Sequence, residues 1–60
     1  MTYRVEAWTV FNRKNYGGGW TEEDVKEITR GYKANPVYSS GTTTAYTRKN
    51  SRKIFFVKAE

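Results

Sequence analysis

Two short segments of the sequence combine cations with aromatic rings, the side chains that suit contact with a polyanion. One segment, RKNYGGGW at residues 13–20, sets two cations beside Tyr16 and Trp20, and the other, RKNSRK at 48–53, adds four cations. Lysine and arginine neutralise phosphates, and aromatic rings stack on unpaired bases. The residues predicted to contact nucleic acid are therefore Arg13, Lys14, Tyr16, Trp20, Arg48, Lys49, Arg52 and Lys53.

The three consecutive glycines between Tyr16 and Trp20 suggest a second chemistry, because glycine-rich loops before helices cradle phosphates. The run NYGGGWTEED nevertheless lacks the GK[ST] ending of a nucleotide P-loop and the spacing of a dinucleotide fingerprint. We therefore interpret residues 12–20 as a flexible connector, since glycine loses the most backbone entropy in regular structure.

The residue types that are missing exclude most catalytic chemistry. The chain has no cysteine and no histidine, so it offers no thiol nucleophile, no imidazole base, no disulfide and no Cys or His metal site. A general base would have to be a strongly shifted Glu or Lys, which a core of this size can hardly bury. We predict a binding protein and not an enzyme, with no catalytic residue, metal or cofactor.

The charge balance points to acidic partners. The 60 residues carry 11 Lys and Arg against 6 Asp and Glu, a net charge of +5. Such a balance favours nucleic acid, either DNA or RNA, or an acidic protein surface as partner. A charge of this size is also ordinary for the solubility of a small domain, so both interpretations stay open.

The first half of the chain predicts a strand, a connector and a helix. Residues 3–12 alternate and are rich in β-branched and aromatic side chains, as in a strand. Thr21 followed by two glutamates and Asp24 is typical of a helix start. Gly31 fits either a glycine just past the helix end or a tolerated interior residue, and Asn35 before Pro36 stops the helix by then.

The second half predicts strands over residues 42–48 and 53–60, joined by a turn, and leaves open whether 36–39 form a separate strand. The predicted fold is α+β: a single domain over residues 1–60, with a single-layer sheet of three or four mainly antiparallel strands. One helix packs on one face, in the order β-α-β-β.

This order predicts where the cations gather. If the helix returns over the sheet, the next strand runs parallel to the first in a right-handed crossover, and the loops 12–20 and 48–53 meet at one end. The acidic start of the helix, Glu22 to Asp24, would lie at that same end and pair with some of the cations.

The apolar side chains divide between the two faces of this predicted sheet. One set reads as the core, and a second set occupies the opposite face, where it predicts a protein interface. The predicted core residues are Tyr3, Phe11, Ile28, Tyr32, Phe55 and Val57. The predicted interface residues are Trp8, Val10, Ile54 and Phe56.

These faces support an alternative function, a protein-binding modulator or inhibitor of the kind that phages and mobile elements often encode. The threonine-rich strand at 42–47 is the expected open edge, which would allow strand addition or a homodimer. The longest apolar run, Ile54 to Val57, is too short for a membrane span, and the N-terminus has no signal-peptide pattern, so we expect a cytoplasmic protein without a membrane partner.

Overall fold

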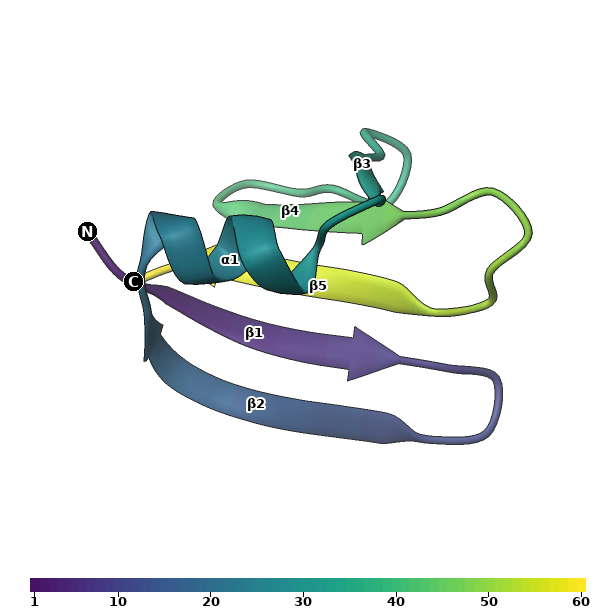
Figure 1. The fold of residues 1–60 in the computed structure, drawn as a ribbon, viewed down its shortest axis with the longest axis horizontal. Coiled ribbons are helices and arrows are strands. Elements are labelled where there is room, and N and C mark those ends of the chain that lie inside the picture. The colour runs from purple at the N-terminus through teal and green to yellow at the C-terminus, as the bar shows by residue number, and fades with distance from the viewer.

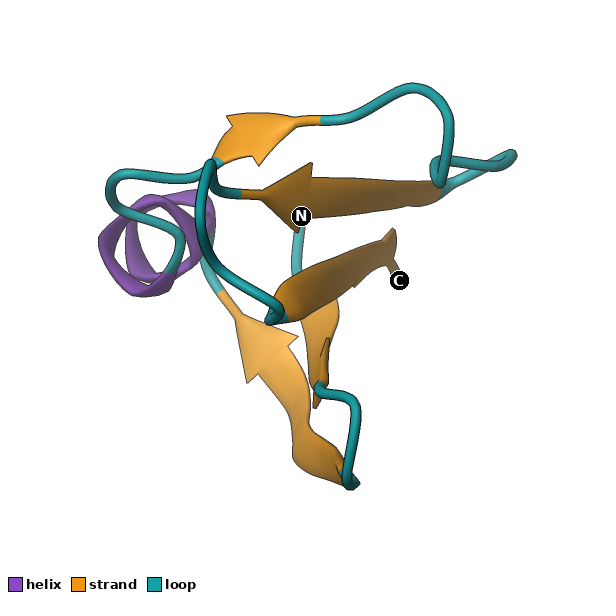
Figure 2. Cartoon of the chain, turned by 90° about the vertical axis from the view of Figure 1, so that its right-hand side faces the viewer, coloured by secondary structure: helices purple, strands orange, loops and turns teal.

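A computed structural model describes all residues, 1–60, as a five-stranded antiparallel sheet with one helix on one of its faces (Figures 1 and 2). The strands lie in the order β2-β1-β5-β4-β3. Along the chain the elements are β1 (Tyr3–Trp8), β2 (Arg13–Trp20), α1 (Glu22–Ile28), β3 (Lys33–Ala34), β4 (Thr43–Thr47) and β5 (Ile54–Ala59). The α+β class is confirmed, but the predicted three or four strands and the order β-α-β-β are wrong.

Strand β2 occupies the segment that the sequence analysis interpreted as a connector. It pairs with β1 from Trp8↔Arg13 to Tyr3↔Trp20, and the register shifts twice along the pair. Each shift places an extra residue on β2, which makes a β-bulge. Gly17 and Gly19 have φ of 82° and 80°, a backbone conformation that only glycine adopts freely. The glycine run is therefore the means by which this strand accommodates its bulges.

Helix α1 begins as predicted and ends before Gly31, the earlier of the two ends that the sequence left open. The Thr21 side chain accepts the Asp24 backbone N–H at 3.2 Å, and the Asp24 carboxylate accepts the Thr21 N–H at 3.3 Å, a complete capping box. The helix ends at Ile28, and Thr29 caps it. Gly31 follows at a φ of 84°, which turns the chain away from the helix axis. With seven residues, α1 is far too short to span a lipid bilayer.

The direction of the helix also differs from the prediction. Because β2 brings the chain back before α1 starts, the helix runs in the same direction as β1 (Figure 1). Every pair of neighbouring strands is antiparallel, so the predicted parallel crossover does not occur.

The core lies between α1 and one face of the sheet. Val25 of the helix packs on Val5, Ala7, Phe55 and Val57 of strands β1 and β5. The prediction is confirmed for Phe55 and Val57, which are buried, whereas the predicted core residues Tyr3, Ile28 and Tyr32 are half-buried around them. It is wrong for Phe11, which lies in the β1–β2 turn and is 89% exposed.

Strand β4 is not at the edge of the sheet, contrary to the prediction for residues 42–47. It lies between β5 and β3, and the loop after β3 continues along its outer side. The Asn35 N–H donates to the Ala45 carbonyl at 2.7 Å, and the Ala45 N–H donates to the Ser39 hydroxyl at 3.0 Å. The long open edge is that of β2, where bulges and charged side chains discourage pairing with another strand.

Candidate functional site

The two turns that carry most of the cations lie at the same end of the sheet. β1 and β4 run in the same direction, so the β1–β2 turn and the β4–β5 turn both close at one end of the long axis (Figure 1). This meeting was predicted to arise from a parallel crossover, and two antiparallel hairpins produce it instead. A seventh cation joins them, because Lys33 pairs with Thr47, the residue before Arg48.

We call this region the turn end. It comprises residues 9–14 and 48–53 together with Lys33. Its cations are Arg13, Lys14, Lys33, Arg48, Lys49, Arg52 and Lys53.

The carboxylates lie elsewhere, and the expectation that the helix acids sit beside the turn cations is wrong. Because β2 runs back along the molecule, α1 starts at the opposite end, and Glu22, Glu23 and Asp24 form its first turn there. Glu60 is at that end too, where its carboxylate accepts the Gly19 N–H at 2.9 Å. The single ion pair of the protein, Arg4 with Glu60 at 3.9 Å, is outside the turn end. The cations of the turn end therefore have no carboxylate partner.

Aromatic rings hold several of these cations in place. The Arg13 guanidinium lies 4.9 Å from the centre of the Trp8 ring, and the Lys53 ammonium lies 4.9 Å from that of Phe55. The Lys14 ammonium is 5.3 Å from the Tyr16 ring centre. Such contacts are worth about 0.5–1 kcal/mol at exposed sites and leave the charge unneutralised. They restrict the side chains while keeping their charge for a ligand.

Of the two aromatic residues predicted to stack on bases, Trp20 lies away from the cations. It ends β2 at the end opposite the turns, and its indole N–H donates to the Tyr16 carbonyl at 3.2 Å. The two rings meet edge to face, 6.2 Å between centres, and both pack against the core. The aromatic residues that are exposed at or beside the turn end are Phe11 and Trp8.

The predicted protein interface divides in a similar way. Trp8 and Ile54 are register partners on the face of the sheet without a helix, and the Phe56 ring meets that of Trp8 edge to face at 5.1 Å. Val10 is not on this face, because it lies in the β1–β2 turn, 66% exposed.

Sequence reasoning missed Phe11 and Lys33 as members of the site. The alternation of residues 3–12 counted Phe11 as the last inward side chain of a longer strand, although β1 ends at Trp8. Residues 9–12 can be identified as a hairpin turn only when β2 is known to be a strand. The position of Lys33 depends on β3, a two-residue strand without a sequence signal.

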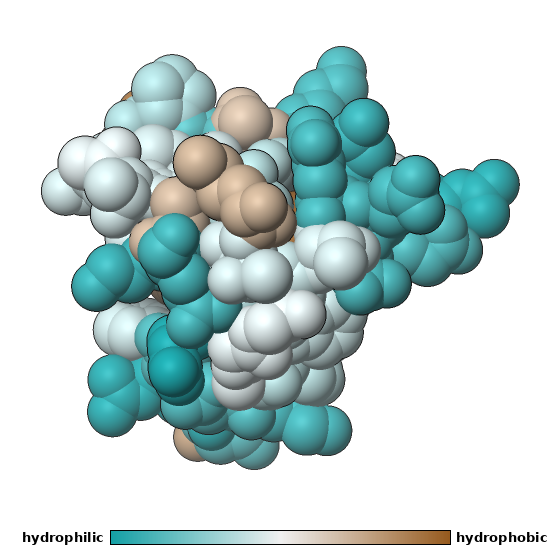
Figure 3. Space-filling model, turned by 90° about the vertical axis from the view of Figure 1, so that its left-hand side faces the viewer, coloured by the Kyte–Doolittle hydropathy of each residue, from teal (hydrophilic) through white to brown (hydrophobic).

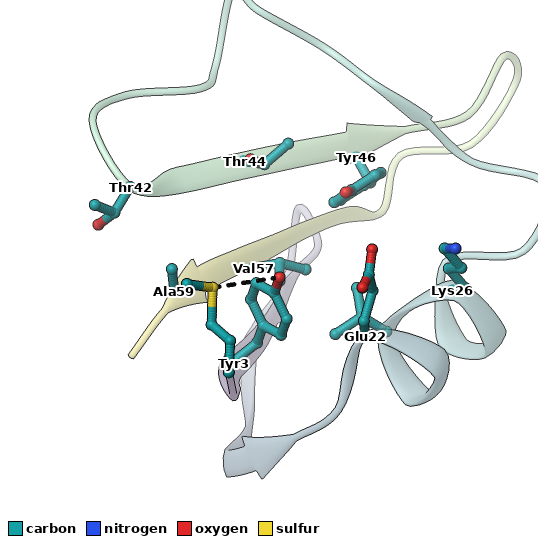
Figure 4. A pocket seen from close by; sticks show the side chains of 10 residues that line it. Tyr3, Glu22, Lys26, Thr42, Thr44, Tyr46, Val57 and Ala59 are labelled. Carbon is teal, nitrogen blue, oxygen red and sulfur yellow. Dashed lines mark hydrogen bonds between the residues drawn. The ribbon is translucent and has the colours of Figure 1, made fainter.

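The opposite end of the molecule holds a separate feature, a cavity of about 280 Å³ between α1 and the sheet. Figure 3 shows a small hydrophobic patch among hydrophilic side chains at this end. Hydroxyl groups of Tyr3, Thr42, Thr44 and Tyr46 share the cavity with apolar side chains, and Glu22 lies across from them (Figure 4).

The single helix packs on β1 and leaves the cavity open on its β4 side, where Thr44 and Tyr46 line it. No group of three or more carboxylates comes together anywhere in the protein to hold a metal ion. The cavity contains neither a carboxylate pair nor a cation cluster, and the concentration of charge is at the turn end.

Comparisons with known proteins give no relative from which a function can be transferred. No protein-family model, no curated protein and no solved structure matches the chain.

Proposed function

We propose that this protein is a small non-enzymatic module that binds nucleic acid through the turn end. The observation that carries the proposal is the separation of charge along the molecule. Seven of the eleven cations are gathered at the turn end without a carboxylate among them. A cluster of unpaired cations is the electrostatic complement of a phosphate backbone.

The roles of the residues follow from their positions. Arg48, Lys49 and Arg52 are exposed in the β4–β5 turn and contact phosphates as free cations. Arg13 and Lys14 begin β2 next to the β1–β2 turn. Their contacts with the rings of Trp8 and Tyr16 hold them near the same ligand. Tyr16 and Trp20 support the core in this proposal and do not touch the ligand.

The proposal predicts a strong dependence of affinity on salt. If four cations contact phosphates of a single strand, the logarithm of the affinity falls with the logarithm of the salt concentration at a slope of about −2.8. Raising the salt fourfold then weakens binding by about 50-fold. Binding that does not respond to salt contradicts the proposal.

The chain offers a matched pair of variants to test the location of binding. The turn variant replaces Arg48, Lys49 and Arg52 by Gln, and the control variant replaces Lys26, Arg30 and Lys58 by Gln. All six side chains are exposed, and each variant loses three positive charges.

Fluorescence anisotropy with labelled DNA and RNA measures the affinity of both variants. We expect the turn variant to lose at least tenfold more affinity than the control. Its affinity should also depend less steeply on salt concentration than that of the control. Equal losses in the two variants would show that net charge alone drives the binding.

A second candidate function is binding of a protein through the open face of the sheet. Trp8, Ile54 and Phe56 form an apolar set there that no helix covers. Such a set is typical of interfaces. A second copy of this chain is the partner that can be tested directly, by sedimentation velocity of the wild type and of Phe56→Ser. A concentration-dependent dimer that Phe56→Ser abolishes supports this candidate, and a monomer at all concentrations excludes the homodimer.

A further inference from the structure

We infer that the preferred ligand of the turn end is a single-stranded nucleic acid, and that Phe11 stacks on one of its bases. This inference rests on the proposed function and names the class of nucleic acid and a further binding residue.

Phe11 has no role in folding that would explain its type. The β1–β2 turn is closed by the Thr9 N–H, which donates to the Asn12 carbonyl at 2.8 Å, and by the Asn12 N–H, which donates to the Thr9 hydroxyl at 3.1 Å. Val10 and Phe11 are the two residues between them, and neither packs on the core. Turn positions of this kind favour Gly, Asn, Asp or Ser. Two apolar side chains at an exposed tip therefore point to a ligand.

The surroundings of the tip specify the chemistry of that ligand. Arg13 follows Phe11 by two residues and pairs in register with Trp8, whose ring is 40% exposed. The β4–β5 turn, which carries four cations, closes at the same end of the sheet as this hairpin, and no carboxylate belongs to the turn end. An exposed aromatic ring at the same end of the molecule as these cations matches a ligand that presents flat bases and phosphates together.

The dimensions of the molecule favour a single strand over a duplex. In a duplex each base is stacked between its neighbours, so a side chain can reach a base face only by unstacking a base step. Proteins that do so offset the free energy of unstacking by wrapping more of the nucleic acid around their surface. The protein measures 30 × 22 × 21 Å, so the turn end is only about 20 Å across. The turn end therefore has little surface around which a duplex could wrap. A single strand exposes the faces of its bases without any unstacking of a duplex.

The test compares one labelled sequence of about 12 nucleotides as a single strand and as a duplex, by fluorescence anisotropy. We expect the single strand to bind about tenfold more tightly than the duplex. Phe11→Ser should lower the single-strand affinity about tenfold and change the duplex affinity less than twofold, whereas Phe11→Tyr keeps the ring and the affinity. Circular dichroism confirms that the variants fold.

Tryptophan emission gives a second reading of the same site. The protein has two tryptophans, and Trp20→Phe leaves Trp8 as the only one. We expect the emission of Trp8 to be quenched by the oligonucleotide at saturation, because bases then lie against the hairpin.

The outcomes separate the two proposals. Salt-dependent binding with no effect of Phe11→Ser, or with a duplex bound as tightly as the single strand, overturns the inference and leaves the proposed function standing. Absence of binding to every nucleic acid overturns both. Binding to vesicles of anionic phospholipid in place of oligonucleotides would assign the apolar tip to a lipid surface and also overturns the inference.

Discussion

The bulged strand β2 predicts that L-alanine and D-alanine have opposite effects on stability when either replaces Gly17. Gly17 has a φ of 82°, and a Cβ built on it meets no atom within 4 Å. A substitution there is therefore free of collisions and tests the backbone conformation alone. We compare Gly17→Ala with Gly17→D-Ala, prepared by chemical synthesis of the chain.

The magnitudes follow from two terms of opposite sign. The left-handed conformation costs an L-residue about 1–2 kcal/mol. Replacing glycine by alanine restricts the unfolded chain, which stabilises the folded state by about 0.4–1 kcal/mol. The L-variant is therefore destabilised by about 0.5–1 kcal/mol on balance. The D-variant prefers positive φ, so it keeps only the favourable term and is stabilised by about 0.4–1 kcal/mol.

Thermal unfolding followed by circular dichroism measures both variants. In a domain of this size 1 kcal/mol corresponds to about 4–8 °C, so the two midpoints should differ by roughly 10 °C, with the wild type between them. Equal midpoints for the L- and D-variants would refute the reasoning, because they would show that Gly17 does not hold a left-handed conformation. Residues 13–20 would then be the connector that composition suggests.

Two further substitutions test the core and the helix. Phe55→Ala removes a buried ring that meets Tyr32 edge to face at 5.0 Å. We expect the free energy of unfolding, measured by urea titration, to fall by about 3–5 kcal/mol, enough to unfold much of a domain this small. Thr21→Ala removes the acceptor for the Asp24 N–H and should lower the free energy of unfolding by about 1 kcal/mol in the same assay, whereas no loss would mean that the capping box is not formed in solution.

The elements that the sequence predicted well are those whose signals are local. The alternation over β1, the capping residues at Thr21 and the buried Phe55 and Val57 each depend on a few neighbouring residues. The position of residues 48–53 was also predictable, because a turn between two strands must lie at the end of a sheet. These features required no knowledge of the partner strands.

The features that were missed depend on pairing between distant segments. Three glycines have no strand propensity of their own, and β2 exists because β1 supplies its hydrogen-bond partners. The two residues of β3 are a strand only beside β4, and the outer side of β4 is covered only because the following loop returns along it. The exposure of Phe11 was missed for the same reason, because its turn exists only where β1 is followed by strand β2.

The missed strand changes the electrostatics more than it changes the fold class. If residues 13–20 were a connector, the helix would start beside the turns, and its acids would offset their cations. Strand β2 instead carries the chain to the other end of a molecule that is 30 Å long, before Glu22, Glu23 and Asp24 begin the helix. Electrostatic interactions through solvent fade over about 8 Å at physiological salt. A phosphate that approaches the turn end therefore experiences seven cations, whereas Glu22, Glu23, Asp24 and Glu60, four of the six carboxylates, lie at the other end of the molecule. The local field at the turn end is stronger than the net charge of +5 suggests.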